Sequence, residues 1–67
     1  MAGDAIVVVR DQKIRGRRVL VTAERLRQND GWLVVARVDG ALHDAWLSIS
    51  PEQEAERMLS EINGALH

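Results

Sequence analysis

The sequence predicts an α+β fold, in which a four-stranded antiparallel β-sheet forms a meander and one C-terminal α-helix packs on one face (β-β-β-β-α). Two observations carry this prediction. Short runs rich in Val, Ile, Leu and Trp are separated by Asn-Asp-Gly and Asp-Gly, which are turn signals of hairpins between antiparallel strands. The last part of the chain repeats its apolar residues every three or four positions, the spacing of an amphipathic helix. Residues 1–67 are one small domain, near the lower size limit for burying an adequate core.

The first two strands are predicted from β-branched runs. Ala5–Arg10 contains Ile and three consecutive Val residues without helical spacing, which favours a strand that is apolar on both faces, at a central position or covered on both sides. Asp11–Gly16 is polar and is predicted as the connection, with Gly16 available for a positive φ. Arg17–Arg27 is predicted as the second strand from its Val-Leu-Val-Thr centre. Its end is ambiguous, because Thr22–Leu26 is also compatible with one helical turn capped by its first residue.

Two turn signals frame the third strand. Asn29-Asp30-Gly31 precedes the apolar run Trp32–Val38, and Asp39-Gly40 follows it. Both signals contain a residue pair that tolerates the positive φ values of a tight hairpin turn. The chain then passes through Ala41–Asp44 into Ala45–Ile49, which is predicted as the fourth strand.

The C-terminal segment Ser50–Leu66 is predicted as the helix. Ser50 is a suitable N-cap, Pro51 suits the first helical position, and Gln53 can reach back to the Ser50 amide as a capping box. Gly64 stands where a left-handed cap is expected to end the helix. The residues at helical spacing form one apolar stripe: Ala55, Met58, Leu59, Ile62 and Leu66.

Alternation along the strands sorts the side chains onto two faces of the sheet. We expect the helix to cover an apolar face made of Val19, Val21, Ala23, Trp32, Val34, Ala36, Val38, Ala45, Leu47 and Ile49. One helix covers one face only, so the opposite face should expose an apolar centre with a polar rim, as interaction surfaces do. The residues that we predict to bind a partner there are Leu20, Leu33, Val35, Arg37 and Trp46.

A partner on this face would compensate for the small core. The chain contains no cysteine, so no disulfide can stabilise it. We therefore expect a homodimer or a protein partner, bound through this face or through pairing of an edge strand. The alternative is a monomer with one solvated face, because antiparallel sheets commonly expose a few Leu or Trp side chains to water.

Charge is distributed unevenly along the chain. Residues 1–28 contain seven basic and three acidic residues, a net charge of +4, whereas residues 29–67 contain two and seven, a net charge of −5. Such asymmetry is compatible with nucleic-acid binding by a small regulator. The residues predicted to contact phosphates in this alternative are Arg10, Lys13, Arg15, Arg17, Arg18, Arg25 and Arg27. The acidic helix is an equally reasonable partner for them within the fold.

The sequence does not indicate an enzyme. It contains no nucleophile elbow and no glycine-rich phosphate loop, and a chain this short has little depth for a pocket that excludes water. His43-Asp44 and His67 match no metal-ligand spacing. We therefore expect no cofactor, no metal and no small-molecule substrate. The five-residue apolar run Ala5–Val9 is too short for a signal peptide or a membrane span, so we expect a cytoplasmic protein that does not bind membranes.

Overall fold

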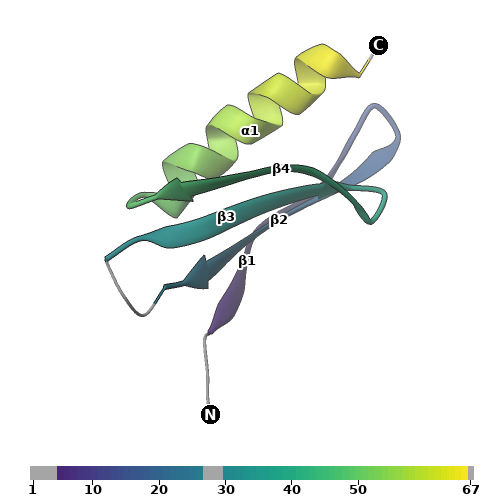
Figure 1. Cartoon of the computed structure of the whole chain (residues 1–67). Coiled ribbons are helices and arrows are strands. Elements are labelled where there is room, and N and C mark those ends of the chain that lie inside the picture. Colours follow the sequence, from purple (N-terminus) through teal and green to yellow (C-terminus); the bar gives the residue numbers. More distant parts are fainter. Residues whose placement is uncertain (1–4, 27–29, 67) are drawn as a thin grey trace.

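A computed structural model describes residues 5–26 and 30–66 of the chain. It confirms the predicted α+β fold: four antiparallel strands form one open sheet in the order β1-β2-β3-β4, and one C-terminal helix packs on it (Figure 1). The elements are β1 (Ile6–Ile14), β2 (Arg17–Arg25), β3 (Trp32–Val38), β4 (Ala41–Ser48) and α1 (Pro51–Ala65). Neighbouring strands are consecutive in the chain, as the predicted meander requires.

The hydrophobic core lies between α1 and the adjacent face of the sheet. The helical stripe contributes Ala55, Met58 and Ile62, all with no exposed surface, and Leu59 packs against them. The sheet contributes side chains from its two central strands and from the end of β1: Ile14, Val19, Val21, Ala23, Val34 and Ala36. The small alanines let the helix approach the sheet closely. The opposite face of the sheet carries no other described element (Figure 1).

The first strand is longer than predicted. The polar residues Asp11, Gln12 and Lys13, which suggested a loop, continue the pairing of β1 with β2. They tolerate this position because β1 is an edge strand, so one side of the strand stays in water. The prediction that the first strand is central or covered on both sides is therefore wrong, and its Ile6 and Val8 side chains are exposed. The connection is only Arg15-Gly16, with φ values of 53° and 82°, which are typical of a two-residue hairpin turn.

The second and third strands follow the prediction more closely. The residues from Thr22 to Arg25 pair with β3, so the alternative of a helical turn at Thr22–Leu26 is wrong. The third strand has the predicted bounds. Arg27 and Asn29 lie outside the described residues.

The fourth strand starts earlier than predicted, and its faces are reversed. Asp39-Gly40 alone makes the turn, with φ values of 53° and 84°, so β4 begins at Ala41. A β-bulge then shifts the register between β3 and β4. Arg37 pairs with Leu42 and Ala36 with Asp44, which leaves His43 without a partner on β3. The bulge shifts the alternation of the strand, which sequence periodicity alone does not reveal.

The reversal moves residues from one face of the sheet to the other. Trp46 pairs with Val34, and paired residues in an antiparallel ladder share a face, so Trp46 lies on the helix side. Ala45 and Leu47 lie on the face opposite α1, and Ile49 follows the strand with 84 % of its surface exposed. The prediction that these three residues contact the helix is therefore wrong.

Both ends of the helix also differ in detail from the prediction. The Ser50 side chain caps nothing, and the Ser50 N–H donates to Ser48 Oγ (3.0 Å) instead of to Gln53. The Ser48 hydroxyl in turn donates to the Ser50 carbonyl oxygen (3.2 Å). Gly64 lies within the helix, which ends at Ala65. The C-cap residue Leu66 is extended, and its N–H donates to the Ile62 carbonyl oxygen (2.9 Å).

Candidate protein interface on the open sheet face

The side of the sheet opposite α1, called the open face below, is built from residues of all four strands, which alternate along each strand except at the register shifts in β1 and β4. Cross-strand pairing arranges twelve of these residues in three rows, and the pair of Lys13 and Arg18 follows on β1 and β2. The rows are Ile6, Glu24, Leu33 and Leu47; Val8, Thr22, Val35 and Ala45; and Asp11, Leu20, Arg37 and Leu42. Eight of the twelve positions are apolar, so the face is mainly apolar, with Thr22 and three charged residues among them.

The exposed large apolar side chains of the open face lie at its two edges. Ile6 and Val8 on β1 have 64 % and 61 % of their surfaces exposed, and Leu42 and Leu47 on β4 have 66 % and 61 %. Four strands at about 4.8 Å spacing and five residues at about 3.4 Å rise give the face an area of roughly 300 Å² in projection. Apolar patches of this size on monomers are often functional.

The structure brings together four of the five residues predicted to bind a partner. Leu20, Leu33, Val35 and Arg37 lie on the open face, next to one another on β2 and β3. Trp46 does not join them, because the bulge in β4 places it on the helix side, where it keeps 59 % of its surface exposed.

Sequence reasoning missed the four exposed residues at the edges of the open face. The Ile-Val-Val-Val run of β1 was recognised as apolar on both faces, a signal that Ile6 and Val8 belong here. Leu42 could have been placed by counting from the Asp39-Gly40 turn, because it pairs with Arg37 before the bulge. Leu47 lies beyond the bulge and could not be placed in this way. Leu47 also lines a shallow hollow with Leu26 and Ile49 at the end of the sheet.

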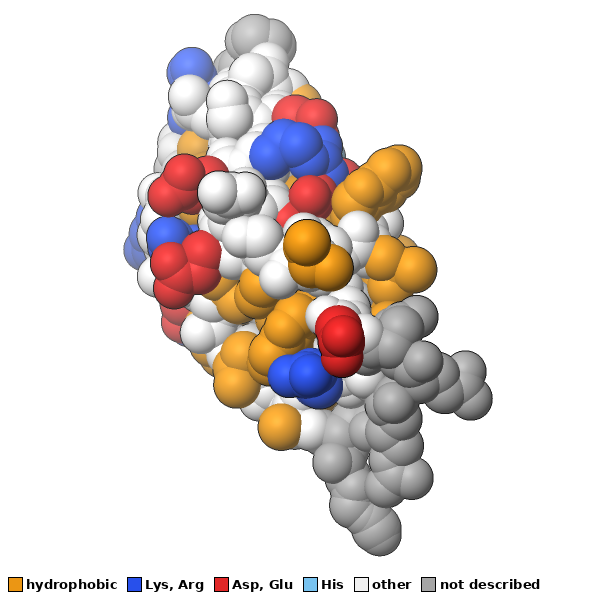
Figure 2. Space-filling view, turned by 90° about the vertical axis from the view of Figure 1, so that its left-hand side faces the viewer, with side chains coloured by type: hydrophobic (Ala, Val, Ile, Leu, Met, Phe, Trp, Pro, Cys, Tyr) orange, Lys and Arg blue, Asp and Glu red, His pale blue; other side chains and the backbone are white. Residues whose placement is uncertain are grey.

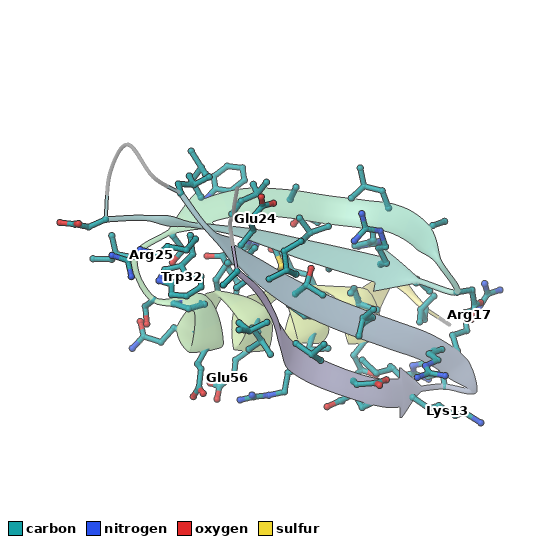
Figure 3. All side chains as sticks on the ribbon, turned by 90° about the horizontal axis from the view of Figure 1, so that it is seen from below. Lys13, Arg17, Glu24, Arg25, Trp32 and Glu56 are labelled. Carbon is teal, nitrogen blue, oxygen red and sulfur yellow. The ribbon has the colours of Figure 1, made fainter. Side chains whose placement is uncertain are left out.

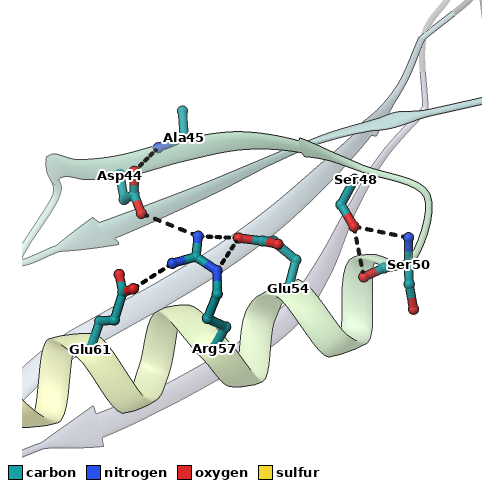
Figure 4. A network of polar contacts seen from close by, with 7 residues as sticks. All are labelled: Asp44, Ala45, Ser48, Ser50, Glu54, Arg57 and Glu61. Carbon is teal, nitrogen blue, oxygen red and sulfur yellow. Dashed lines mark hydrogen bonds and ion pairs between the residues drawn. The ribbon is translucent and has the colours of Figure 1, made fainter.

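Trp46 instead belongs to a polar cluster that joins the edge of the sheet to the helix. Arg57 donates to Glu54 and Glu61 on its own helix, and its Nη2 lies 3.6 Å from Asp44 Oδ2 on β4 (Figure 4). The guanidinium also lies 5.8 Å from the centre of the Trp46 ring. The hydrogen bond to Glu54 raises the pKa of Arg57 further above its ordinary value, so the side chain stays charged. The contacts with Asp44 and Trp46 connect α1 to β4.

The basic residues of the predicted nucleic-acid site are distributed along the sheet. Lys13 and Arg17 lie at the β1–β2 turn, whereas Arg25 lies toward the other end beside Trp32, with 5.4 Å between its guanidinium and the centre of the ring (Figure 3). The Arg15 Nε–H points to Asn63 on the helix. Four arginines form ion pairs: Arg10 with Glu56 (3.8 Å), Arg17 with Asp39 (3.3 Å), Arg18 with Asp11 (3.1 Å) and Arg25 with Asp30 (4.0 Å).

Acidic side chains from several elements neutralise the positive charge of these arginines. The acidic helix supplies one partner, Glu56, and aspartates in strands and turns supply the other three. On the side of the molecule seen in Figure 2, blue and red side chains alternate instead of forming one basic patch. Exposed pairs of this kind contribute little to stability, yet they reduce the positive potential available to a phosphate.

Two further properties concern the described residues. Among residues 5–26 and 30–66, no group of three or more His, Asp or Glu side chains is placed to hold a metal ion. No helix in this part of the chain is long and apolar enough to cross a membrane.

Comparison of the chain with protein-family models, curated proteins and solved structures finds no match.

Proposed function

We propose that this chain is a small non-enzymatic interaction module that assembles with itself or with another protein through the open face. The observation that supports the proposal most is the apolar character of that face, with Ile6, Val8, Leu42 and Leu47 each more than 60 % exposed. The largest apolar patch on a monomeric protein is often a functional surface. Covering the open face would give each of these side chains roughly 1–2 kcal/mol of additional transfer free energy.

The size of the domain supports the same proposal. A chain of 67 residues without cysteine buries a small core, and here that core fills only one side of the sheet. A second layer on the open face would turn the sheet into the middle of a packed assembly, the usual arrangement for a sheet with two apolar faces. Burial of the open face on assembly would then increase the free energy of unfolding, which is small when the core alone provides it.

Methyl NMR spectra recorded at increasing protein concentration test the proposal residue by residue. We expect the methyl resonances of Leu33, Val35 and Leu47 to shift with concentration, because these groups enter the interface. The methyl resonances of Val21 and Ile62 in the core serve as internal controls and should not move. Shifts confined to residues outside the open face, or no shifts at any concentration or with any added protein, would contradict the proposal.

Nucleic-acid binding through the basic residues of β1 and β2 is the alternative proposal, and it has less support. Arg17, Arg18 and Arg25 each lie within 4.0 Å of an aspartate oxygen. A phosphate would have to displace these carboxylates before it could be neutralised. The basic side chains also lie on both faces and at both ends of the sheet, so they do not form a continuous track for a phosphate backbone.

A further inference from the structure

Two charged side chains near the middle of the open face define how a second copy can bind. Glu24 on β2 is half-buried and pairs in register with Leu33, and Arg37 on β3 is exposed and pairs with Leu20. Each stands two residues from the central pair of Thr22 and Val35, on opposite sides of it. The ordinary rise and spacing of strands separate the two charges by roughly 14 Å, too far for them to pair within one chain.

The remaining charge in the three rows is already balanced. Asp11 accepts two hydrogen bonds from the Arg18 guanidinium, at 3.3 and 3.1 Å. Among the described residues, by contrast, no ion pair involves Glu24 or Arg37. Within the three rows, Glu24 and Arg37 therefore present one negative and one positive charge, set symmetrically about the centre. Lys13 adds a positive charge on the same face beyond these rows, in register with Arg18.

This arrangement is complementary to itself. Consider two copies stacked with their open faces together and related by a two-fold axis between the sheets. If the axis runs across the strands along the row of Thr22 and Val35, the row that contains Glu24 lies over the row that contains Arg37 of the second copy. Glu24 of each copy then lies one strand away from Arg37 of the other, and the contact occurs twice by symmetry. A two-fold axis running along the strands would instead bring Glu24 close to Glu24, and like charges at an interface are unfavourable.

We propose that the open face binds a second copy of this chain, sheet on sheet, about the axis across the strands, and that Glu24 of each copy pairs with Arg37 of the other. This inference rests on the proposed function. The same axis places Leu47 against Leu42 of the second copy, and Val8 against its own equivalent. The apolar contacts provide the binding free energy, and the charges select this orientation. A desolvated ion pair adds little binding free energy, but a charge buried against a like charge or without a partner weakens binding strongly.

Charge reversal tests the pairing. We expect Glu24→Arg and Arg37→Glu each to weaken the dissociation constant of the dimer at least tenfold, measured by sedimentation equilibrium. The double variant Glu24→Arg/Arg37→Glu restores the pair with its signs exchanged, so its dissociation constant should return to within about threefold of the wild-type value. Glu52→Arg makes the same change of charge in the first turn of α1, away from the open face, and should leave the dissociation constant unchanged. Circular dichroism confirms that each variant is folded.

The outcomes separate this inference from the proposed function. Single reversals that leave the dissociation constant unchanged, or a double variant that stays as weak as the singles, would overturn the Glu24–Arg37 pairing. If Leu47→Ser still weakened the dimer in that case, the open face would remain the interface in another orientation. A wild-type chain that is monomeric and binds no protein would overturn the proposed function itself. A dimer that responds to none of these variants would point to pairing through the exposed edge of β1.

Discussion

Leu47 and Trp46 provide a direct comparison of the two sides of the sheet, because they are neighbours on β4 with nearly equal exposure. Leu47 on the open face is 61 % exposed, and Trp46 on the helix side is 59 % exposed. We predict that Leu47→Ser weakens self-association strongly, whereas Trp46→Ser does not. The comparison is informative because a tryptophan would ordinarily be the stronger candidate for an interface residue.

The expected magnitude follows from the exposed fraction of Leu47. Full burial of a leucine contributes roughly 2–3 kcal/mol, so the exposed three fifths represent roughly 1.5 kcal/mol that only assembly can realise. A two-fold dimer contains this side chain twice, which gives roughly 3 kcal/mol and about a 100-fold weaker dissociation constant for Leu47→Ser. The free energy of unfolding of the monomer should change by less than about 1 kcal/mol, because most of the side chain is in water before assembly.

Sedimentation equilibrium over the micromolar range measures the dissociation constants, and urea denaturation of diluted samples measures the free energies of unfolding. A Trp46→Ser variant that dissociates as much as Leu47→Ser would refute the division of β4 into an open side and a helix side. A Leu47→Ser variant that assembles like the wild type would refute the use of exposed apolar area to locate the interface.

Three further predictions follow from the packing, the helix start and the ion pairs. Met58→Ala should lower the free energy of unfolding by about 2–5 kcal/mol in urea denaturation, because the Met58 side chain is fully buried between helix and sheet. Ser48→Ala should lower it by about 1 kcal/mol through loss of both hydrogen bonds to Ser50, whereas Ser50→Ala should have a smaller effect because that side chain caps nothing. Fluorescence anisotropy at low salt should detect no tight binding of duplex DNA or RNA. Affinity that falls steeply with added salt would instead support phosphate contacts by the basic residues.

The fold class could be predicted because local signals agreed along the whole chain. The Asp39-Gly40 turn, the apolar run of β3 and the spacing of Ala55, Met58 and Ile62 each had one interpretation, and the structure confirms all three. The polar residues Asp11–Lys13 were predicted as a loop, but they belong to β1. An edge strand can carry polar residues and still keep its hydrogen bonds to the neighbouring strand. The helix start was predicted correctly, with Ser50 before it and Pro51 at its first position. The predicted capping hydrogen bonds are absent, because the Ser50 N–H donates to Ser48 Oγ and the Ser50 side chain caps nothing.

The candidate interface was only partly predictable. Residues of the central strands, such as Leu20 and Val35, were placed correctly because β2 and β3 pair without interruption. The faces of β4 could not be inferred, because this strand carries apolar residues on both sides and a bulge changes its register near Asp44. The charge symmetry of Glu24 and Arg37 is invisible in the sequence, since it depends on which residues of separate strands share a row.

The molar mass of the wild-type chain in solution is the most direct test of an interface on the open face. The chain has a mass of 7.5 kDa, and we expect light scattering to report twice this value as the concentration rises through the micromolar range. A mass of 7.5 kDa at every concentration, together with open-face methyl resonances that do not respond to dilution, would contradict self-association through this surface.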